Sequence, residues 1–427
     1  MMNGMFKSRH MRHIFLFFLL VSKMAAAQVI TLDQVNQLAQ TNYPLISQNK
    51  LISQTADINI DNLSKNFLPQ VTLSGQASYQ SEVTKITIPV PGIYITPPNK
   101  DQYKLIADVN QLIYDGGAVK EQKKIQLLNS DLEQKKVAVE LFKLKERINQ
   151  LYLSVLFFDE QLKQVELVKA DLRNGINKVE AQVKNGVAFR SNLNVLKAEL
   201  LKADQRIIEL RSARKGLIET LELFINQKLN ENTSFQKPEN IFAGTDTLIQ
   251  RPELNMFTAQ EKLINSQYKL IDARNLPKAS LFAQGGYGRP GLNFLKNEFE
   301  FYYLTGVRIN WSLGNLYTKK NDHQLLEVNK KIVNVQKDIF LLNTNTQLKQ
   351  QSSEIEKLQQ LIVKDNEIIV LRTGIKEAAK AQLENGVITA NDYLREVNAE
   401  DQSRQTLITH QLQLLQAQIN YQTISGK

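Results

Sequence analysis

The sequence contains two copies of one boundary, in which a polar segment runs into Leu-Pro and then into alternating apolar and polar residues. The first copy reads NFLPQVTLSGQASY over 66–79, and the second reads NLPKASLFAQGGY over 275–287. When Pro69 is aligned with Pro277, a shift of 208 positions, the same shift aligns Pro44 with Pro252. A recurrence of several landmarks at one fixed shift indicates an internally duplicated fold.

Both copies predict a β-hairpin after the Leu-Pro pair, because the residues that follow alternate with the period of a strand. The first hairpin is expected over 70–114, with a proline-rich loop at 88–98 between its strands. The second is expected over 278–313, with strands at 281–287 and 301–313. A half-buried strand of a soluble protein alternates in the same way, so a single strand does not by itself indicate a membrane.

Two long stretches without proline follow the hairpins, and their apolar residues recur at spacings of three and four. They predict helices over 118–184 and 318–384, each on the order of 100 Å long at 1.5 Å per residue. Each stretch ends at Asn-Gly-Val and leads into a shorter helix, expected over 191–228 and 391–423. A tight turn between two long helices produces an antiparallel helical hairpin.

The first 27 residues have the order of a secretory signal. Cationic residues precede the apolar run at 14–21, and three alanines follow it. The apolar run is too short to cross a bilayer as a helix, which argues against a membrane anchor. We therefore expect residues 1–27 to be a signal peptide, followed by a first repeat over 28–250 and a second over 251–427, each opening with a helix of about 23 residues before its Leu-Pro pair.

Composition and residue pattern argue against several classes of function. The 427 residues include no cysteine, which excludes disulfides and thiol chemistry. Four of the ten net positive charges lie in the first 27 residues, and the remaining +6 is modest; no basic cluster is interleaved with aromatics, so nucleic acid is not an expected partner. His323 and His410 are isolated in the sequence, and no catalytic constellation or nucleotide-binding loop is recognisable. We expect neither an enzyme nor a cofactor.

Four strands per chain cannot close a barrel, and an open sheet edge cannot face lipid. If the strands lie in a membrane, several copies must pool them, and three copies would supply twelve strands, within the range of bacterial outer-membrane barrels. The aromatic residues near the strand ends fit the interface girdles of such barrels, with ordinary tyrosine usage as the alternative. These aromatics are Tyr79, Tyr103, Tyr114, Tyr287, Tyr302, Tyr303 and Trp311.

The ordered set of landmarks resembles the TolC-like outer-membrane efflux channel family. It comprises two Leu-Pro strand starts, two glycine-containing strand ends, two long helices and two Asn-Gly-Val turns, and it covers nearly all of the chain after residue 27. The resemblance implies a mixed fold, in which a long antiparallel coiled-coil helical barrel continues into a transmembrane β-barrel formed by a trimer.

The resemblance also implies a function and partners. Such channels are inserted in the outer membrane. They conduct cargo passively out of the cell, in efflux or type I secretion. They extend into the periplasm and dock to a periplasmic adaptor protein and an inner-membrane pump. A structural periplasmic coiled-coil protein without a pore is the alternative, although such a protein has no need of amphipathic hairpins.

The resemblance assigns the adaptor contacts to the tips of the helical hairpins, at Gly186, Val187, Gly386 and Val387. It also places a carboxylate at the periplasmic entrance of the lumen. Asp392 matches that position, whereas Arg395 stands at a further place that is sometimes acidic in the family.

The family pattern is not kept at the latch that closes the periplasmic end. Asn192 stands where the family often has an acid, and the usual partner positions hold Leu383 and Ile388. We therefore expect a different latch, with Arg190, Asp392 and Arg395 as candidates. The alternative is that Asp392 only caps a helix.

Overall fold

A computed structural model describes residues 29–86, 92, 97–230, 233–239 and 248–426 of the chain. The expected signal peptide at 1–27 and most of the proline-rich loop at 88–98 lie outside these ranges. In chain order the elements are β1 (Val29–Ile30), α2 (Leu32–Asn42), α3 (Ile46–Ser64), η1 (Lys65–Phe67), β2 (Gln70–Tyr79), β3 (Asp101–Tyr114), α4 (Ala118–Lys184), α5 (Arg190–Ile225), β4 (Ser234–Phe235), α6 (Pro252–Arg274), β5 (Lys278–Arg289), β6 (Glu300–Asn310), α7 (Asn315–Glu384) and α8 (Ala390–Ser425).

The residues form two compact units, and each unit draws on both sequence repeats. One unit comprises Met1–Ile46, Leu141–Gln250 and Thr344–Lys427, and the other comprises Ser47–Glu140 and Arg251–Asn343. The first therefore contains the helical turns that end α4 and α7, and the second contains the strands.

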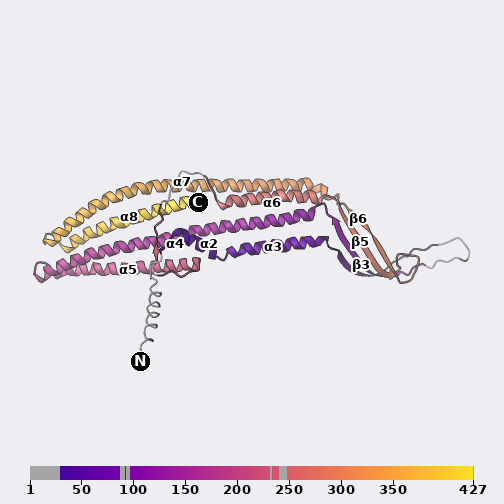
Figure 1. Cartoon of the computed structure of the whole chain (residues 1–427), viewed down its shortest axis with the longest axis horizontal. Coiled ribbons are helices and arrows are strands. Elements are labelled where there is room, and N and C mark those ends of the chain that lie inside the picture. Colours follow the sequence, from indigo (N-terminus) through magenta and orange to yellow (C-terminus); the bar gives the residue numbers. More distant parts are fainter. Residues whose placement is uncertain (1–28, 87–91, 93–96, 231–232, 240–247, 427) are drawn as a thin grey trace, which may run out of the picture. The chain divides into compact units, whose positions relative to one another are not determined.

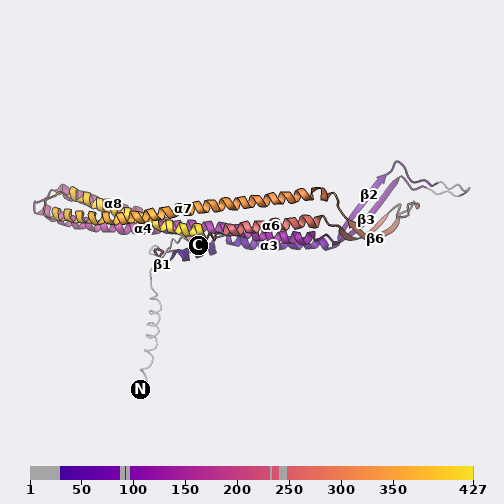
Figure 2. The same ribbon diagram turned by 90° about the horizontal axis from the view of Figure 1, so that it is seen from above.

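The second unit contains a four-stranded antiparallel sheet in the order β2-β3-β5-β6. Both expected hairpins are present, as β2 with β3 and β5 with β6. Figures 1 and 2 show these strands side by side. The pairing of β3 with β5 joins the two repeats, with a register shift between Leu112 and Tyr114. Within the described residues, β2 and β6 are the outer strands and each has one unpaired edge.

The helices pack in antiparallel pairs within each unit, as the heptad pattern predicts. In the first unit, α5 lies beside the later part of α4, and α8 lies beside the later part of α7 (Figure 1). A shared apolar cluster joins these four helices and includes Leu172, Leu196, Leu383 and Tyr393. In the second unit, Phe257 and Ile264 of α6 pack against Val333 of α7.

A second core of the first unit is built around Tyr152, whose side chain is fully buried. Its hydroxyl lies 2.9 Å from the Ile30 carbonyl oxygen and 2.6 Å from that of Gln236. These residues flank a two-stranded parallel sheet of β1 and β4. The two short strands carry no recognisable period in the sequence and were not predicted.

Several element ends differ from the expected ones by a few residues. The strand expected to reach 313 ends at Asn310, because the Trp311 indole donates a hydrogen bond to the Asn275 carbonyl oxygen at 3.0 Å and lies outside the ladder. Helix α5 ends at Ile225 rather than 228, since Asn226 adopts a left-handed conformation with φ of 50°. The first long helix has the expected bounds, and the second begins three residues early, at Asn315.

No helix in the described part of the chain is both long enough and apolar enough to cross a membrane.

Candidate functional site

One face of the four-stranded sheet is a continuous, exposed apolar surface. Strand register places Leu73, Ala107, Gly285 and Tyr303 in one row across all four strands. The side chains of this face are apolar or small almost throughout, and its large members remain exposed, from 40% for Tyr287 to 85% for Phe301. We call this surface the apolar face; its large members are Val71, Leu73, Tyr79, Tyr103, Leu105, Leu281, Tyr287, Phe301, Tyr303, Val307 and Ile309.

The opposite face holds most of the charged and amide side chains of the sheet, together with several apolar ones, whereas Asp101, Gln111 and Arg289 lie on the apolar face. The Gln284 amide donates to Asp108 at 3.2 Å, and the Arg308 guanidinium lies 4.7 Å from the centre of the Phe282 ring. Tyr302 also belongs to this face, and its ring occupies the space that a side chain at Gly286 would need. Tyr302 is therefore not part of the apolar face.

Four tyrosines, one on each strand, form a stepped line across the apolar face. Tyr79 pairs with Asp101, Tyr103 follows two residues on, Tyr287 pairs with Leu105, and Tyr303 lies in the row of Ala107. From each tyrosine to the next, the line advances about 6.6 Å along the strands and about 4.8 Å across them. A line of this kind is inclined to the strands, as a membrane interface is in a barrel whose strands tilt by roughly 35–45°.

Tyr114 and Trp311 mark the other end of the strands. Tyr114 is the last residue of β3, and Trp311 directly follows β6; both are more than half exposed. Along β3, Tyr103 and Tyr114 are eleven residues apart, or about 36 Å. At a tilt of about 40° this gives roughly 28 Å, close to the apolar band of an outer-membrane barrel at about 25 Å. The aromatics thus fit two interface girdles.

The two Asn-Gly-Val turns have the same backbone geometry. The amide of Val187 donates to the Gln182 carbonyl oxygen at 2.8 Å, and Gly186 donates to Val183 at 3.1 Å. The second turn repeats both hydrogen bonds one for one. This is the Schellman arrangement of a helix end, which requires a left-handed residue after the last turn. Gly186 and Gly386 supply it, with φ of 71° and 73°.

We expect Gly186→Ala and Gly386→Ala each to destabilise a tip by about 1 kcal/mol, because an L-residue is strained at positive φ. No heavy atom lies within 4 Å of a Cβ built at either glycine, so steric overlap adds nothing to this cost. Hydrogen exchange of the amides at 182–187 and 382–387 measures the effect. Gly216→Ala is the matched control, because Gly216 lies inside α5 with equally open surroundings and should not be destabilised.

The two turns are connected to each other within the first unit. The Gln182 side-chain amide donates to the carbonyl oxygens of Leu383 and Glu384, at 3.0 and 3.1 Å. Val187, Val387 and Phe189 are exposed by 69%, 71% and 80%. Phe189 was not singled out from the sequence, although an aromatic residue beside a Gly-Val turn could have been noticed.

Asp392 is the third residue of helix α8 and forms a capping box with Thr389, the N-cap residue. Its carboxylate accepts hydrogen bonds from the Thr389 amide at 3.2 Å and from the Thr389 hydroxyl at 2.7 Å, while its own amide donates to that hydroxyl. The hydrogen bond from the Thr389 side chain is the main cause that lowers the pKa of Asp392, and the charge of Arg395 adds to it. Asp392 thus takes part in capping α8, although the N-cap residue itself is Thr389 and not Asp392.

Within the described residues, no hydrogen bond or ion pair joins the side chains of the other predicted gate residues, Arg190, Asn192 and Arg395, to one another. Arg395 makes its hydrogen bond to Glu396, at 3.2 Å. The amide of Asn192 donates to the Phe189 carbonyl oxygen at 3.1 Å, and Arg190 is the exposed first residue of α5. Leu383 is 4% exposed and Ile388 packs against the same apolar cluster, so both serve the core.

Replacing Thr389 with valine should destabilise the start of α8 by about 1 kcal/mol, because the hydroxyl that accepts from the Asp392 amide is lost. Faster hydrogen exchange at 390–393 measures the loss. Phe189 holds the same position before α5 and makes no side-chain cap. Phe189→Ala should therefore leave exchange at 190–193 unchanged, and an equal effect of both substitutions would contradict this assignment.

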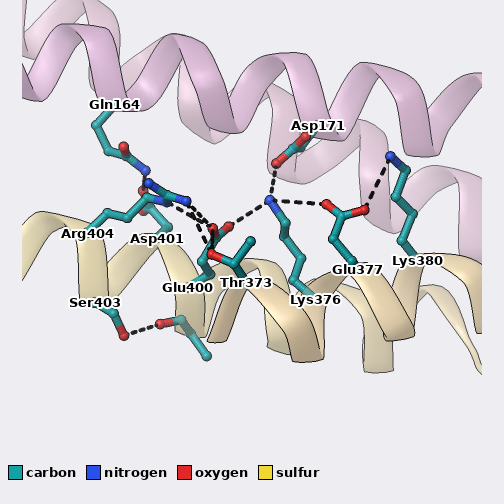
Figure 3. Close-up of polar contacts among 11 residues, drawn as sticks. Gln164, Asp171, Thr373, Lys376, Glu377, Lys380, Glu400, Asp401, Ser403 and Arg404 are labelled. Atoms are coloured by element: carbon teal, nitrogen blue, oxygen red, sulfur yellow. Dashed lines mark hydrogen bonds and ion pairs between the residues drawn. The ribbon is translucent and has the colours of Figure 1, made fainter. Parts of the chain in front are cut away.

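A buried ionic network lies between α4, α7 and α8 (Figure 3). The Lys376 ammonium is 2.8 Å from both Asp171 and Glu400, and the side chains of Lys376 and Glu400 are only 9% and 6% exposed. Glu400 also accepts from Thr373 at 2.8 Å and from Arg404 at 2.7 Å. The network therefore joins α4 of the first repeat to α7 and α8 of the second.

The network changes the protonation of its members. Burial opposes the charge of Lys376, but its hydrogen bonds to Asp171 and Glu400 outweigh burial and raise its pKa. Burial likewise opposes the charge of Glu400, and the bonds from Lys376, Arg404 and Thr373 lower its pKa. Both groups are held in their charged forms. No group of residues in the described part of the chain is arranged to hold a metal ion.

The chain is similar to known proteins both in sequence and in structure. Residues 35–227 match the family model described as outer membrane efflux protein. No curated protein sequence matches the chain.

Solved structures share the fold over 92% of this chain. The chain is 15% identical to CusC, whose structures describe transmembrane channel formation, with 92% of that chain covered and a TM-score of 0.67. It is 14% identical to the outer membrane protein VceC from Vibrio cholerae, with 96% covered and a TM-score of 0.65. The CmeC outer membrane channel of Campylobacter jejuni gives 14% identity, 85% coverage and a TM-score of 0.63. Residues 35–227 thus resemble the outer membrane efflux protein family in sequence, and the whole chain shares the fold of these outer-membrane channels.

Proposed function

We propose that this protein is the outer-membrane channel of a tripartite efflux system and conducts its cargo passively. The observation that carries the proposal is the apolar face on a sheet with two unpaired outer edges. An apolar face of this size is stable against lipid, and unpaired edges must be satisfied by other strands there. The polar opposite face would then line the lumen.

Three copies of the chain would close the barrel with twelve strands, the outer strand β6 of one copy pairing with β2 of the next. A second surface supports association of copies. Five large apolar side chains on α7 recur at spacings of three and four and are 49–62% exposed, which is the pattern of a coiled-coil seam without its partner. They are Leu325, Val328, Ile332, Val335 and Ile339.

We propose that the tips bind a periplasmic adaptor, which in turn engages an inner-membrane pump. The exposed Val187, Phe189 and Val387 offer apolar contacts, and Gly186 and Gly386 fix the turns that present them. Apolar side chains exposed at a rigid turn are typical anchors for a protein partner. The tip residues would thus determine which adaptor is accepted.

Arg190, Asn192, Asp392 and Arg395 remain the candidates for the gate at the periplasmic entrance. Asp392 is held near its helix start by Thr389, so its charge has a fixed position from which it can meet cations of a neighbouring copy. The triple variant Arg190→Gln, Asp392→Asn, Arg395→Gln should raise the open probability in a planar bilayer. Unchanged conductance and unchanged drug sensitivity of cells would remove these charges from the gate.

Fractionation and conductance test the proposed function. The protein should be recovered from the outer membrane as a heat-sensitive trimer, and the purified protein should conduct in a planar bilayer. Recovery as a soluble periplasmic protein that produces no conductance would instead favour the structural coiled-coil alternative.

A further inference from the structure

A cavity of 490 Å³ lies where strand β3 leads into helix α4. Its apolar wall includes Phe67, Ile113, Tyr114 and Leu127. Its other wall is formed by Lys120, Lys123 and Lys124, which lie on the same side of α4 as Leu127 because their spacing follows the helical repeat. The cavity therefore combines an apolar surface with three ammonium groups.

The positive charge of this cavity is not neutralised by neighbouring side chains. Within the described ranges, none of the three lysines makes a side-chain hydrogen bond or an ion pair. Asp115 also lines the cavity, but its two carboxylate oxygens accept hydrogen bonds from the backbone amides of Gly117, at 2.9 Å, and Val119, at 2.6 Å. A ligand that brings a negative charge would complement the site.

The cavity is continuous with the apolar face of the sheet. Tyr114 is the last residue of β3, pairs with Ala279 in the same face, and also lines the cavity. Tyrosine and lysine at the end of a membrane-spanning strand are placed at the level of lipid head groups. A ligand here would have its charged part beside the lysines and its apolar part against the sheet.

We propose that this cavity binds an anionic glycerophospholipid of the leaflet that faces the periplasm. The phosphate lies among Lys120, Lys123 and Lys124, and the acyl chains follow Ile113 and Tyr114 onto the apolar face. The inference rests on the proposed function as an outer-membrane channel. A second copy of the chain is a poorer occupant, because β3 is paired on both sides and the copies would join at β2 and β6.

The second repeat provides an internal comparison. Its corresponding cavity of 550 Å³ includes Lys319 and Lys320, but also Glu327. Lys319 lies 2.8 Å from Asp272, so its charge is already paired. We expect this second cavity to show no selection for anionic lipid, which leaves one selective site per chain.

Native mass spectrometry of the intact assembly tests the proposal, with phosphatidylglycerol and phosphatidylcholine of identical acyl chains as probes. The double variant Lys120→Gln, Lys124→Gln should bind phosphatidylglycerol roughly 30-fold more weakly and phosphatidylcholine as before. Lys135→Gln, Lys136→Gln is the matched control, because it removes two charges from the same helix, where both lysines pair with acids. The control should retain wild-type affinity for both lipids.

Three results of the lipid-binding measurements would overturn the proposal. These are equal binding of both lipids by the wild type, equal weakening in both variants, and displacement of the lipid by soluble glycerol phosphate at equal concentration, which would indicate a site for free anions only. Dissociation of the assembly in the first variant would show that a second copy occupies the cavity, and would also overturn it. Conductance of the same samples separates the two claims, since a conducting protein without lipid selectivity refutes this inference alone.

Discussion

Replacing Leu73 with arginine should prevent most of the protein from assembling in the outer membrane. Leu73 is 71% exposed on the apolar face, in the row of Ala107, well inside the two proposed aromatic girdles. An arginine that faces lipid near the middle of a barrel costs about 2–4 kcal/mol, and each trimer would carry three of them. The measurement is the amount of heat-sensitive trimer recovered from the outer membrane.

The adjacent residue supplies the control for this prediction. Ser74 is on the opposite face, which would line the lumen. Ser74→Arg should assemble at nearly the wild-type level and shift the ion selectivity of the channel towards anions, because a lumen substitution adds charge to the water-filled path. Equal assembly of the two variants would contradict the assignment of the faces.

Replacing Lys376 with methionine should destabilise the helices of the first unit by about 3–5 kcal/mol. The substitution removes the ammonium that joins Asp171 to the buried Glu400 and leaves Glu400 with Arg404 as its remaining cation, and removal of one member of a buried ion pair has a cost of this order. The measurement is the free energy of unfolding from urea titration, together with hydrogen exchange along α7 and α8. Lys380→Met is the control, because Lys380 is 38% exposed and pairs only with Glu377.

The same network predicts how stability depends on pH. Because the fold lowers the pKa of Glu400, this carboxylate stabilises the fold at pH values above its unfolded pKa of about 4.5. This contribution is lost as the pH falls through the folded pKa. The raised pKa of Lys376 acts in the other direction, and its contribution is lost as pH rises beyond about 10.5. In Lys376→Met the acid loss should begin at a higher pH. An identical acid limb in both proteins would contradict the role of the ion pair.

Much of the fold could be predicted because the chain repeats itself. The Leu-Pro pairs gave the strand starts, and long runs without proline gave α4 with its correct bounds. These signals are local, since proline ends a helix and apolar spacing sets its period wherever they occur. The structural matches confirm the mixed fold of long helices and four antiparallel strands.

Features that depend on contacts between distant residues were not predictable. The pairing of β3 with β5 connects the two repeats, and the sequence of neither strand indicates which strand it pairs with. Lys376 and Glu400 lie in helices rich in charged residues, and only packing distinguishes them from solvated neighbours. The gate stays a prediction for the same reason, because its contacts are expected between copies of the chain.

Single-channel recording of a cysteine variant tests the central claim, that three copies pool their strands around a lumen. The chain has no cysteine, so Ser74→Cys introduces one reactive thiol per copy. A charged, water-soluble thiol reagent should change the conductance of this variant in three equal steps, and it should not affect Leu73→Cys, whose thiol faces lipid. A different number of steps, or the same response in both variants, would contradict the account.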